Sequence, residues 1–340
     1  MATTPANRDI IAIGGSLGSS VGLKAIIKDL PAGLSASVFI STHIPAHGPS
    51  MLAEILATNA NLPIAQALDG QPIERGRVYV AAPDRHLLLI AGTIRMGVGP
   101  RENMVRPSID PFFRSAALSY GPRVTGVILS GMLNDGVAGL HAIKARGGIT
   151  VVQHPLDAEA DQMPLAALES VEIDHVAPAS DLGELLATLS RSAPGPAANV
   201  DDSLELEVDI AAGARLGSDR LRRLATPSAL SCPDCHGVLS EMKGDGPLRY
   251  RCQIGHAYTA EALATHIDEV DEAIRVAMRV MEERVTLVER MAIDARRTGR
   301  AAVAELYEAR AEEYRRYAVT LRDAAVTSLR LGRTPRDRDI

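Results

Sequence analysis

The stretch IAIGGSLGSSVGLKAIIKDL, from Ile11 to Leu30, decides the fold. It begins with an apolar, strand-like run, passes two glycines, and continues with apolar residues at helical spacing. Its segment GGSLG (14–18) matches G-x-S-x-G, a pattern that places a serine on a sharp turn between a strand and a helix. Such a short match in a glycine-rich turn is more often structural than catalytic. The pattern alone therefore leaves both interpretations open.

Strand-like and helical segments alternate from about residue 9 to residue 190. This alternation predicts a doubly wound, mainly parallel α/β sheet with flanking helices over residues 1–190. We expect 86–92 and 93–98 to form an antiparallel hairpin set into that sheet. The other predicted strands are 9–15, 37–43, 77–83, 123–131 and 149–154. The predicted helices are 22–30, 50–59, 111–120, 136–147 and 164–170.

Composition limits the functional classes. The 340 residues suggest two or three folded units, and 46% hydrophobic with 23% charged residues is typical of a globular protein. A net charge of -6 gives no reason to expect a nucleic-acid partner, because proteins that bind nucleic acids usually carry an excess of basic residues. No apolar run approaches the ~20 residues of a membrane-spanning helix, and the N-terminus has no apolar signal core. We therefore expect a cytoplasmic protein without membrane insertion.

Three polar side chains follow predicted strands: Ser16, His43 and Asp135. Each has an ordinary interpretation by itself: a turn serine, a polar strand end and a helix N-cap. Because parallel strands end at one edge of their sheet, we expect all three to lie there together. A serine needs a nearby base, and imidazole has a suitable pKa, so the three residues predict a nucleophile, base and orienting carboxylate.

Other strand ends offer the competitors Asp84 and His154, but neither adjoins as tight a turn. The order Ser, His, Asp differs from the Ser, Asp/Glu, His order of α/β-hydrolases, which disfavours a small-molecule esterase. No P-loop or dinucleotide-binding pattern fits residues 11–24. The helix N-terminus after Ser16 could instead stabilise an oxyanion.

Five collinear segments show a resemblance to a known family. They are IAIGGSLGSSVGL, FISTHIPA, VRPSIDPFFRSAA, GVILSGMLNDGVAGL and GGITVVQHPLDAEADQMPLAALE. Together, over about residues 8–190, the chain resembles the catalytic domain of the CheB-type chemotaxis protein-glutamate methylesterases. The resemblance implies a catalytic triad of Ser16, His43 and Asp135, with the Met132 backbone N–H in the oxyanion hole. It also implies hydrolysis of glutamyl γ-methyl esters on chemoreceptor-like signalling proteins, with release of methanol and often deamidation of glutamines.

The sequence departs from the family pattern in three places. Leu17 and Ser19 replace residues of the usual Ser-Thr-Gly-Gly segment, and Leu133 replaces a glycine that tolerates positive φ. No receiver domain precedes Asp9, so we expect no switch by phosphorylation of an attached receiver. Arg106 is equally well interpreted as a substrate-facing charge or as a surface residue. The alternative function is a catalytically weakened adaptor that binds partners through its C-terminal region.

All three cysteines lie in a short segment that indicates a metal site. Cys232 and Cys235 form one pair, and sixteen residues later Cys252 and His256 form another. This spacing predicts a structural Zn²⁺ bound by a Cys3His set, because two tight turns can complete a tetrahedron. Three reduced cysteines are the alternative, and His236 is a less suitable ligand because it directly follows Cys235. We expect no cofactor for catalysis.

The C-terminal half is predicted to contain four segments. They are a linker (191–229), the zinc module (230–258), an α-helical hairpin or coiled coil (259–332) that turns near Thr298 and Gly299, and a tail (333–340). The hairpin could bind a receptor, self-associate, or pack on the enzyme as a cap. Its expected seam, interrupted by Arg284, is Ile267, Val270, Ile274, Ala277, Met281, Val288 and Met291.

Overall fold

The computed structural model describes residues 7–215, 217–244, 246–265 and 268–331. The chain divides into a first unit that ends at Ala262 and a second that begins at Leu263. The predicted tail, 333–340, and the predicted seam residue Ile267 lie outside the described residues.

A seven-stranded parallel sheet forms the centre of the first unit, in the order β3-β4-β2-β1-β7-β8-β9. The predicted parallel sheet is therefore confirmed. The central strands are wholly buried because helices cover both faces, which explains their continuous apolar sequences. The strands are β1 (Ile10–Gly15), β2 (Ser37–Thr42), β3 (Ile64–Gln66), β4 (Val78–Val80), β7 (Val124–Ile128), β8 (Ile149–Gln153) and β9 (His175–Ala177).

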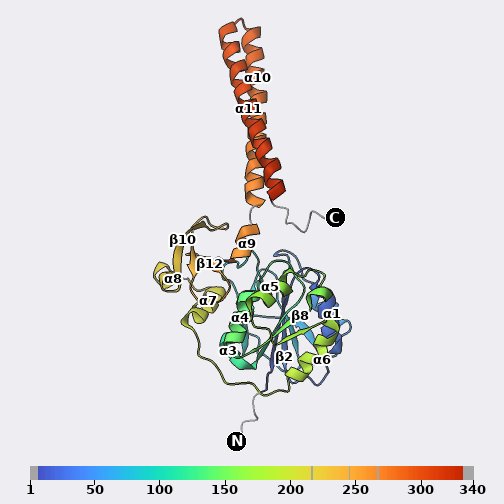
Figure 1. The fold of residues 1–340 in the computed structure, drawn as a ribbon. Coiled ribbons are helices and arrows are strands. Elements are labelled where there is room, and N and C mark those ends of the chain that lie inside the picture. Colours follow the sequence, from blue (N-terminus) through green and yellow to red (C-terminus); the bar gives the residue numbers. More distant parts are fainter. Residues whose placement is uncertain (1–6, 216, 245, 266–267, 332–340) are drawn as a thin grey trace. The chain divides into compact units, whose positions relative to one another are not determined.

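Helices cover both faces of the sheet (Figure 1), and a hydrophobic core lies between each face and its helices. One face carries α1 (Ser19–Asp29), α2 (Leu52–Ala57) and α6 (Ala179–Leu189). The opposite face carries α3 (Ile109–Tyr120), α4 (Val137–Ala145) and α5 (Gln162–Ser170). Short 3₁₀ helices, η1 (Gly121–Arg123) and η2 (Pro155–Asp157), lie in the connections. The chain winds outward from β1 and returns beside it at β7, which makes the end of β1 a topological switch point.

The predicted hairpin exists but does not join the parallel sheet, so that part of the prediction was wrong. Strands β5 (His86–Ile90) and β6 (Thr93–Gly97) form a separate two-stranded sheet, and an isolated bridge links Thr93 of β6 to Pro72. Side chains of α3 occupy the outer edge of β5: Ser115 Oγ accepts a hydrogen bond from the Leu89 N–H, and Ser119 Oγ donates to the Leu89 carbonyl. A strand cannot pair where these hydroxyls bind.

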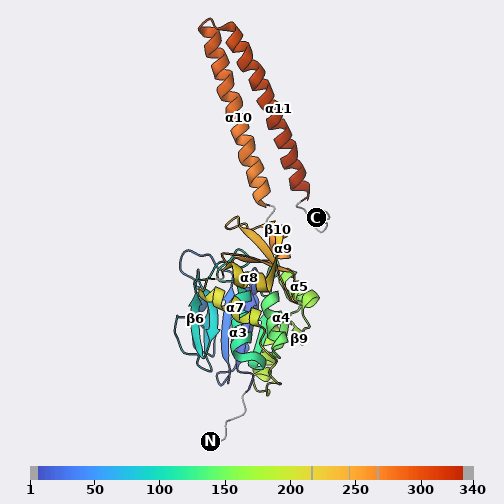
Figure 2. The same cartoon turned by 90° about the vertical axis from the view of Figure 1, so that its left-hand side faces the viewer.

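The segment predicted as a linker, 191–229, contains two helices, α7 (Asp202–Ala212) and α8 (Ser218–Leu224). The Asp201 side chain caps α7 by accepting from the Ser203 N–H, and Gly213 ends it with φ of 117°. Helix α7 packs beside α3, as Figure 2 shows, and buries Glu207 and Ile210. The composition predicts a linker correctly only for the stretch 193–200, which has no regular structure.

The cysteine-bearing segment forms a small antiparallel sheet, here named the ribbon (residues 225–259). Its order is β10-β11-β12-β13. The strands are β10 (Ala225–Ser231), β11 (Val238–Met242), β12 (Arg249–Cys252) and β13 (Ala257–Thr259), and helix α9 (Ala260–Thr265) follows. The predicted boundary at residue 259 therefore falls at the end of β13.

The second unit is a helical hairpin, as predicted, of α10 (Asp268–Arg297) and α11 (Ala301–Leu331), joined at Gly299 with φ of 75°. Met291 is 38% exposed and does not belong to the seam, contrary to our prediction. The less exposed residues of α10 instead follow a strict 4-3 spacing through Ile274, Met278, Met281, Val285, Val288, Ala292 and Ala295. No helix among the described residues is long and apolar enough to span a membrane.

Candidate active site

The structure brings Ser16, His43 and Asp135 together at the carboxyl edge of the parallel sheet. They follow β1, β2 and β7, and β1 pairs with both of the other strands. Ser16 Oγ lies 3.0 Å from His43 Nδ1, and His43 Nε2 lies 2.7 Å from Asp135 Oδ2. A carboxylate only accepts, so Nε2 carries the proton and Nδ1 is free to accept from the serine. The three side chains thus have the contacts of a nucleophile, base and orienting carboxylate.

The turn that carries Ser16 is fixed on both sides. The Ser16 N–H donates to the Ser130 carbonyl at 2.9 Å, and Ser19 Oγ donates to the Ser16 carbonyl at 2.6 Å. Gly18 has φ of 76°, and a Cβ there would lie 2.5 Å from Glu159 Cβ. Glycine is therefore required at this position. Leu17 is 55% exposed, so its replacement of the family's threonine adds no bulk to the core.

Asp135 is only 2% exposed and accepts several hydrogen bonds. Ser108 Oγ and Asn103 Nδ2 donate to Oδ1 at 2.7 and 2.9 Å, and the Ile109 N–H donates to Oδ2 at 2.7 Å. Burial alone would raise the pKa of Asp135, but His43 and these donors hold that pKa well below its usual range. The carboxylate is therefore charged and rigidly oriented toward His43.

Asp110 is a second buried carboxyl beside Asp135. Burial and then the Asp135 charge raise the pKa of Asp110 to about 7. Asn103 Nδ2 donates to Asp110 Oδ2 at 3.1 Å, and the Gly139 N–H donates to Oδ1 at 2.7 Å. The sequence analysis missed both Asn103 and Ser108, although Ser108 lies within the quoted VRPSID segment. No local pattern distinguishes Asn103 from an ordinary loop asparagine.

Met132 lies in the loop between Ser130 and Asp135. Its side chain is 48% exposed, and within the described parts of the chain its backbone N–H has no hydrogen-bond partner. Gly131 anchors the loop, because its N–H donates to the Ala160 carbonyl and its carbonyl accepts from the Met163 N–H. Leu133 adopts φ of 58°, the left-handed conformation that the family's glycine would adopt freely.

The competing candidates lie outside this cluster. Asp84 forms an ion pair with Arg106, whose Nη2 lies 2.7 Å from Asp84 Oδ1. Arg106 Nη1 also donates to the Gly99 carbonyl at 2.7 Å, so this guanidinium holds two loops together. His154 Nδ1 accepts from the Leu156 N–H and caps η2.

The predicted metal ligands also cluster, at one end of the ribbon. The ligand atoms of Cys232, Cys235, Cys252 and His256 lie within 4.8 Å of one another. His256 Nδ1 lies 3.7 Å from Cys232 Sγ and 3.5 Å from Cys252 Sγ, and the Cys235 and Cys252 sulfurs are 3.7 Å apart. A tetrahedral Zn²⁺ with its usual bond lengths would separate two sulfurs by about 3.8 Å and sulfur from nitrogen by about 3.6 Å. The four donors therefore fit a zinc ion, whereas disulfide-bonded sulfurs would be about 2.0 Å apart.

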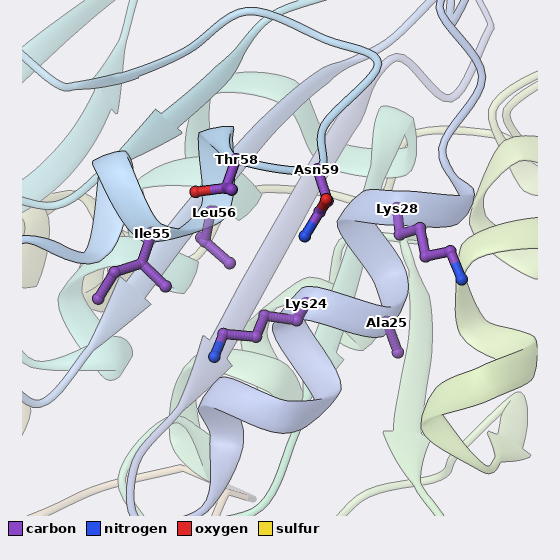
Figure 3. A pocket seen from close by; sticks show the side chains of 7 residues that line it. All are labelled: Lys24, Ala25, Lys28, Ile55, Leu56, Thr58 and Asn59. Atoms are coloured by element: carbon purple, nitrogen blue, oxygen red, sulfur yellow. The ribbon is translucent and has the colours of Figure 1, made fainter.

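A hollow of about 400 Å³ lies away from both clusters, between α1 and α2 (Figure 3). Lys24 and Lys28 line one side and Ile55, Leu56, Thr58 and Asn59 line the other. It contains no residue of the triad, and its two lysines are surface side chains. This hollow therefore offers none of the groups that the sequence analysis predicts for catalysis.

A doubly wound sheet with hydrogen-bonded serine, histidine and aspartate at its carboxyl edge defines a hydrolase of the serine type. Residues 11–186 match the family model described as CheB methylesterase. A relative from Leptospira interrogans is 40% identical over 139 residues, which are 41% of this chain and 72% of that protein. The protein-glutamate methylesterase/protein-glutamine glutaminase 2 of Anaeromyxobacter dehalogenans is 39% identical over 140 residues, 41% of each chain.

Among solved structures, the Thermotoga maritima CheB methylesterase catalytic domain is similar, with a TM-score of 0.52 and 32% identity. The similarity covers 53% of this chain and 98% of that one. The chain therefore belongs to the CheB methylesterase family through its parallel α/β domain. The ribbon and the helical hairpin lie outside the matched residues.

Proposed function

We propose that the protein is a protein-glutamate methylesterase that hydrolyses γ-methyl esters of glutamate on a chemoreceptor-like signalling protein. The hydrogen-bonded series Ser16, His43, Asp135 carries the proposal. The same attack on a side-chain amide would deamidate glutamine, which is the second activity in the relatives' names. Family membership supports both reactions.

The first half of the reaction releases methanol. The Ser16 hydroxyl gives its proton to His43 Nδ1 while Oγ attacks the γ-carbonyl carbon. The resulting imidazolium is stabilised by the buried, charged Asp135. As the tetrahedral intermediate collapses, the proton passes from Nδ1 to the departing methoxide. An acyl ester of Ser16 remains, and water attacks it with His43 again as the base; the Oγ–acyl bond then breaks, the glutamate γ-carboxylate leaves, and His43 returns the proton to Ser16 Oγ.

The Met132 backbone N–H is suited to stabilise the oxyanion of both intermediates. It adjoins the nucleophile's loop and is not engaged by any described residue. An oxyanion donor of this kind contributes about 10²–10³ in rate. The N-terminus of α1, directly after the Ser16 turn, adds a favourable dipole.

An open site beside apolar side chains favours a protein substrate. His43 is partly exposed, and Leu17 and Met132 are exposed next to the triad. A methylated glutamate on the surface of a helical receptor could reach Ser16 without a deep pocket. We infer a cytoplasmic setting from the methyl-accepting substrates of such enzymes.

Ser16→Ala tests the catalytic role. We expect methanol release from methylated receptor to fall by at least about 10³-fold, because the serine provides the covalent route. Ser20→Ala, an exposed serine in α1, is the matched control and should retain activity. Equal methanol release by wild type and Ser16→Ala would contradict the proposal and would favour an adaptor that acts by binding alone.

We further propose that Cys232, Cys235, Cys252 and His256 hold a structural Zn²⁺. A closed set of four protein ligands leaves no position for substrate, so the ion stabilises the ribbon and does not contact the reacting groups. Burial, and then neighbouring Cys232, raises the pKa of the Cys252 thiol to about 12, and a bound cation would remove that cost.

Metal analysis of the purified protein should give one zinc per chain. The variant Cys232→Ser plus Cys252→Ser should lose it, because half of the ligands are removed. His236→Ala should keep it, since His236 is outside the ligand cluster. A stoichiometry near zero for wild type, or unchanged zinc in the double variant, would exclude the site.

A further inference from the structure

We propose that the ribbon holds the catalytic aspartate in position through Asn103, which makes the ribbon a working part of the esterase site. The inference rests on the activity proposed above. It concerns the contact between the α/β domain, which matches the family model, and the ribbon, which lies outside the matched residues. Its basis is a continuous set of hydrogen bonds from β13 to Asp135.

Asn103 is held by the ribbon on two sides. Its backbone N–H donates to the Ala257 carbonyl at 2.8 Å, and its side-chain Oδ1 accepts from the Thr259 N–H at 2.9 Å. Asn103 adopts φ of 51° and is only 9% exposed. Asparagine tolerates this left-handed conformation better than most residues do, but it still requires support from its neighbours.

The Thr259 contact reinforces the orientation in which the NH₂ group of the Asn103 amide faces Asp135. Because the backbone N–H of Thr259 can only donate, it binds the amide oxygen and turns the NH₂ group toward the carboxylates. Nδ2 then donates to Asp135 Oδ1 at 2.9 Å and to Asp110 Oδ2 at 3.1 Å. The acceptor oxygens of Asp135 and Asp110 favour the same orientation, so the Asn103 amide is held from both ends, and loss of β13 would remove the contact on its oxygen side.

The residue beside the catalytic aspartate is also bound by the end of the ribbon. Thr259 Oγ1 donates to Asn134 Oδ1 at 2.5 Å, and Asn134 Nδ2 donates to Glu261 Oε2 at the start of α9. Asn134 is 4% exposed, so these contacts are shielded from water. The side chain of Asn134 is therefore bound directly by residues 259 and 261, and that of Asp135 indirectly through Asn103.

The ion cluster of the ribbon leads to the same loop. Arg251 Nη1 donates to the Gly255 carbonyl, between the ligands Cys252 and His256. Arg251 Nη2 forms an ion pair with Glu102 at 3.0 Å, and Glu102 directly precedes Asn103. Both charged side chains are at most 3% exposed. Because Cys252 and His256 flank the turn that leads into β13, we expect loss of the metal to loosen the residues that hold Asn103.

Asn103→Ala tests the positioning role. We expect kcat for methanol release to fall by about 10²-fold while KM stays unchanged, because misplaced catalytic groups slow chemistry more than binding. Asn61→Ala is the control, since Asn61 Nδ2 likewise donates two hydrogen bonds, but to the backbone carbonyls of Lys28 and Leu30 and to no residue of the triad. Full kcat in Asn103→Ala would overturn the proposal.

A double-mutant cycle separates positioning from general stability. If Asn103 acts through Asp135, then adding Asn103→Ala to an Asp135→Ala variant should lower kcat by less than about twofold. An equal loss in both backgrounds would mean that Asn103 merely supports the fold. Cys252→Ser should reproduce the kcat loss of Asn103→Ala and add little to it, and unchanged kcat in Cys252→Ser would remove the ribbon from the proposal.

A spectroscopic readout makes the test independent of the ester substrate. The His43 Nε2 proton should give a downfield proton NMR signal, assigned by its absence in Asp135→Ala. We expect the signal to be lost or shifted in Asn103→Ala and Cys252→Ser, and after removal of Zn²⁺ by a chelator, with recovery when Zn²⁺ is restored. An unchanged signal in all three overturns the inference, even if wild type releases no methanol and the proposed function itself fails.

Discussion

Leu133 occupies a backbone conformation that favours glycine, next to the loop that carries Met132. Its φ of 58° costs roughly 1–2 kcal/mol for a residue with a side chain. The Leu133 N–H donates to Gln162 Oε1 at 3.0 Å, which holds the turn in place. Leucine in place of the family's glycine therefore adds conformational strain to this turn.

Leu133→Gly should raise the free energy of unfolding by about 0.5–1 kcal/mol, because relief of the left-handed strain exceeds the entropy cost of glycine. Urea denaturation of the full chain measures it, and kcat should not fall. Leu156→Gly is the control: Leu156 is 94% exposed and has no positive φ, so glycine there should destabilise slightly. A lower unfolding midpoint for Leu133→Gly would refute the strain argument.

At the scale of elements, buried charges join α3, α7 and the ribbon. Arg114 of α3 and Arg251 of β12 both contact Glu102 and Glu207, and all four side chains are at most 3% exposed. Burying a charged pair costs desolvation free energy, but removing one partner costs more, because it leaves the other charge buried without a counter-charge. Sequence patterns cannot predict such a network, because its members come from four separate segments and each resembles a surface residue locally.

Acid should weaken this junction. Burial would raise the pKa values of Glu102 and Glu207, but the arginines hold both below their usual range. The unfolded chain therefore binds more protons below about pH 4.5, and the free energy of unfolding falls as pH falls further. In Glu207→Gln, the free energy of unfolding at pH 7 should be about 3 kcal/mol lower than in wild type. It should also decline less steeply between about pH 5 and pH 3, because one of the titrating carboxylates is gone.

The measurement is chemical denaturation of the full chain at a series of pH values, followed by circular dichroism. Glu205→Gln, an exposed glutamate on the same helix, should follow the wild-type curve. If the free energy of unfolding falls with the same slope in wild type and in Glu207→Gln, the buried ion pairs of Glu207 are not a cause of the acid sensitivity.

At the scale of the whole molecule, the ribbon belongs with the α/β domain and the helical hairpin is a unit of its own. In α11 the less exposed positions repeat as Ala304, Tyr307, Ala311, Tyr314, Ala318 and Leu321, which match the 4-3 seam of α10. The two matching seams pack α10 and α11 against each other as in a two-helix coiled coil.

Two truncations distinguish the units. A chain ending at Thr265 keeps the ribbon and should hydrolyse a small glutamate γ-methyl ester with wild-type kcat. A chain ending at Arg191 loses α7 and the ribbon, and its kcat should fall by about 10²-fold or more because Asp135 loses its support. Size-exclusion chromatography with light scattering would show whether loss of the hairpin also changes the oligomeric state. Wild-type kcat in the chain that ends at Arg191, or loss of activity in the chain that ends at Thr265, would contradict the assignment of the ribbon to the catalytic unit.

The sequence by itself determined the parallel sheet, the three strand-end residues and the metal-ligand cluster. Apolar runs, turns and strand direction are local signals, and the four metal donors lie close along the chain, with Cys232 and His256 separated by 24 positions. Only the tertiary structure decided that Asn103 contacts Thr259, 156 positions away. It also decided that Glu207 of α7 forms ion pairs with both Arg114 of the α/β domain and Arg251 of the ribbon. These pairings depend on long-range geometry, because a polar side chain becomes part of a site only when another segment removes it from water and supplies its partner.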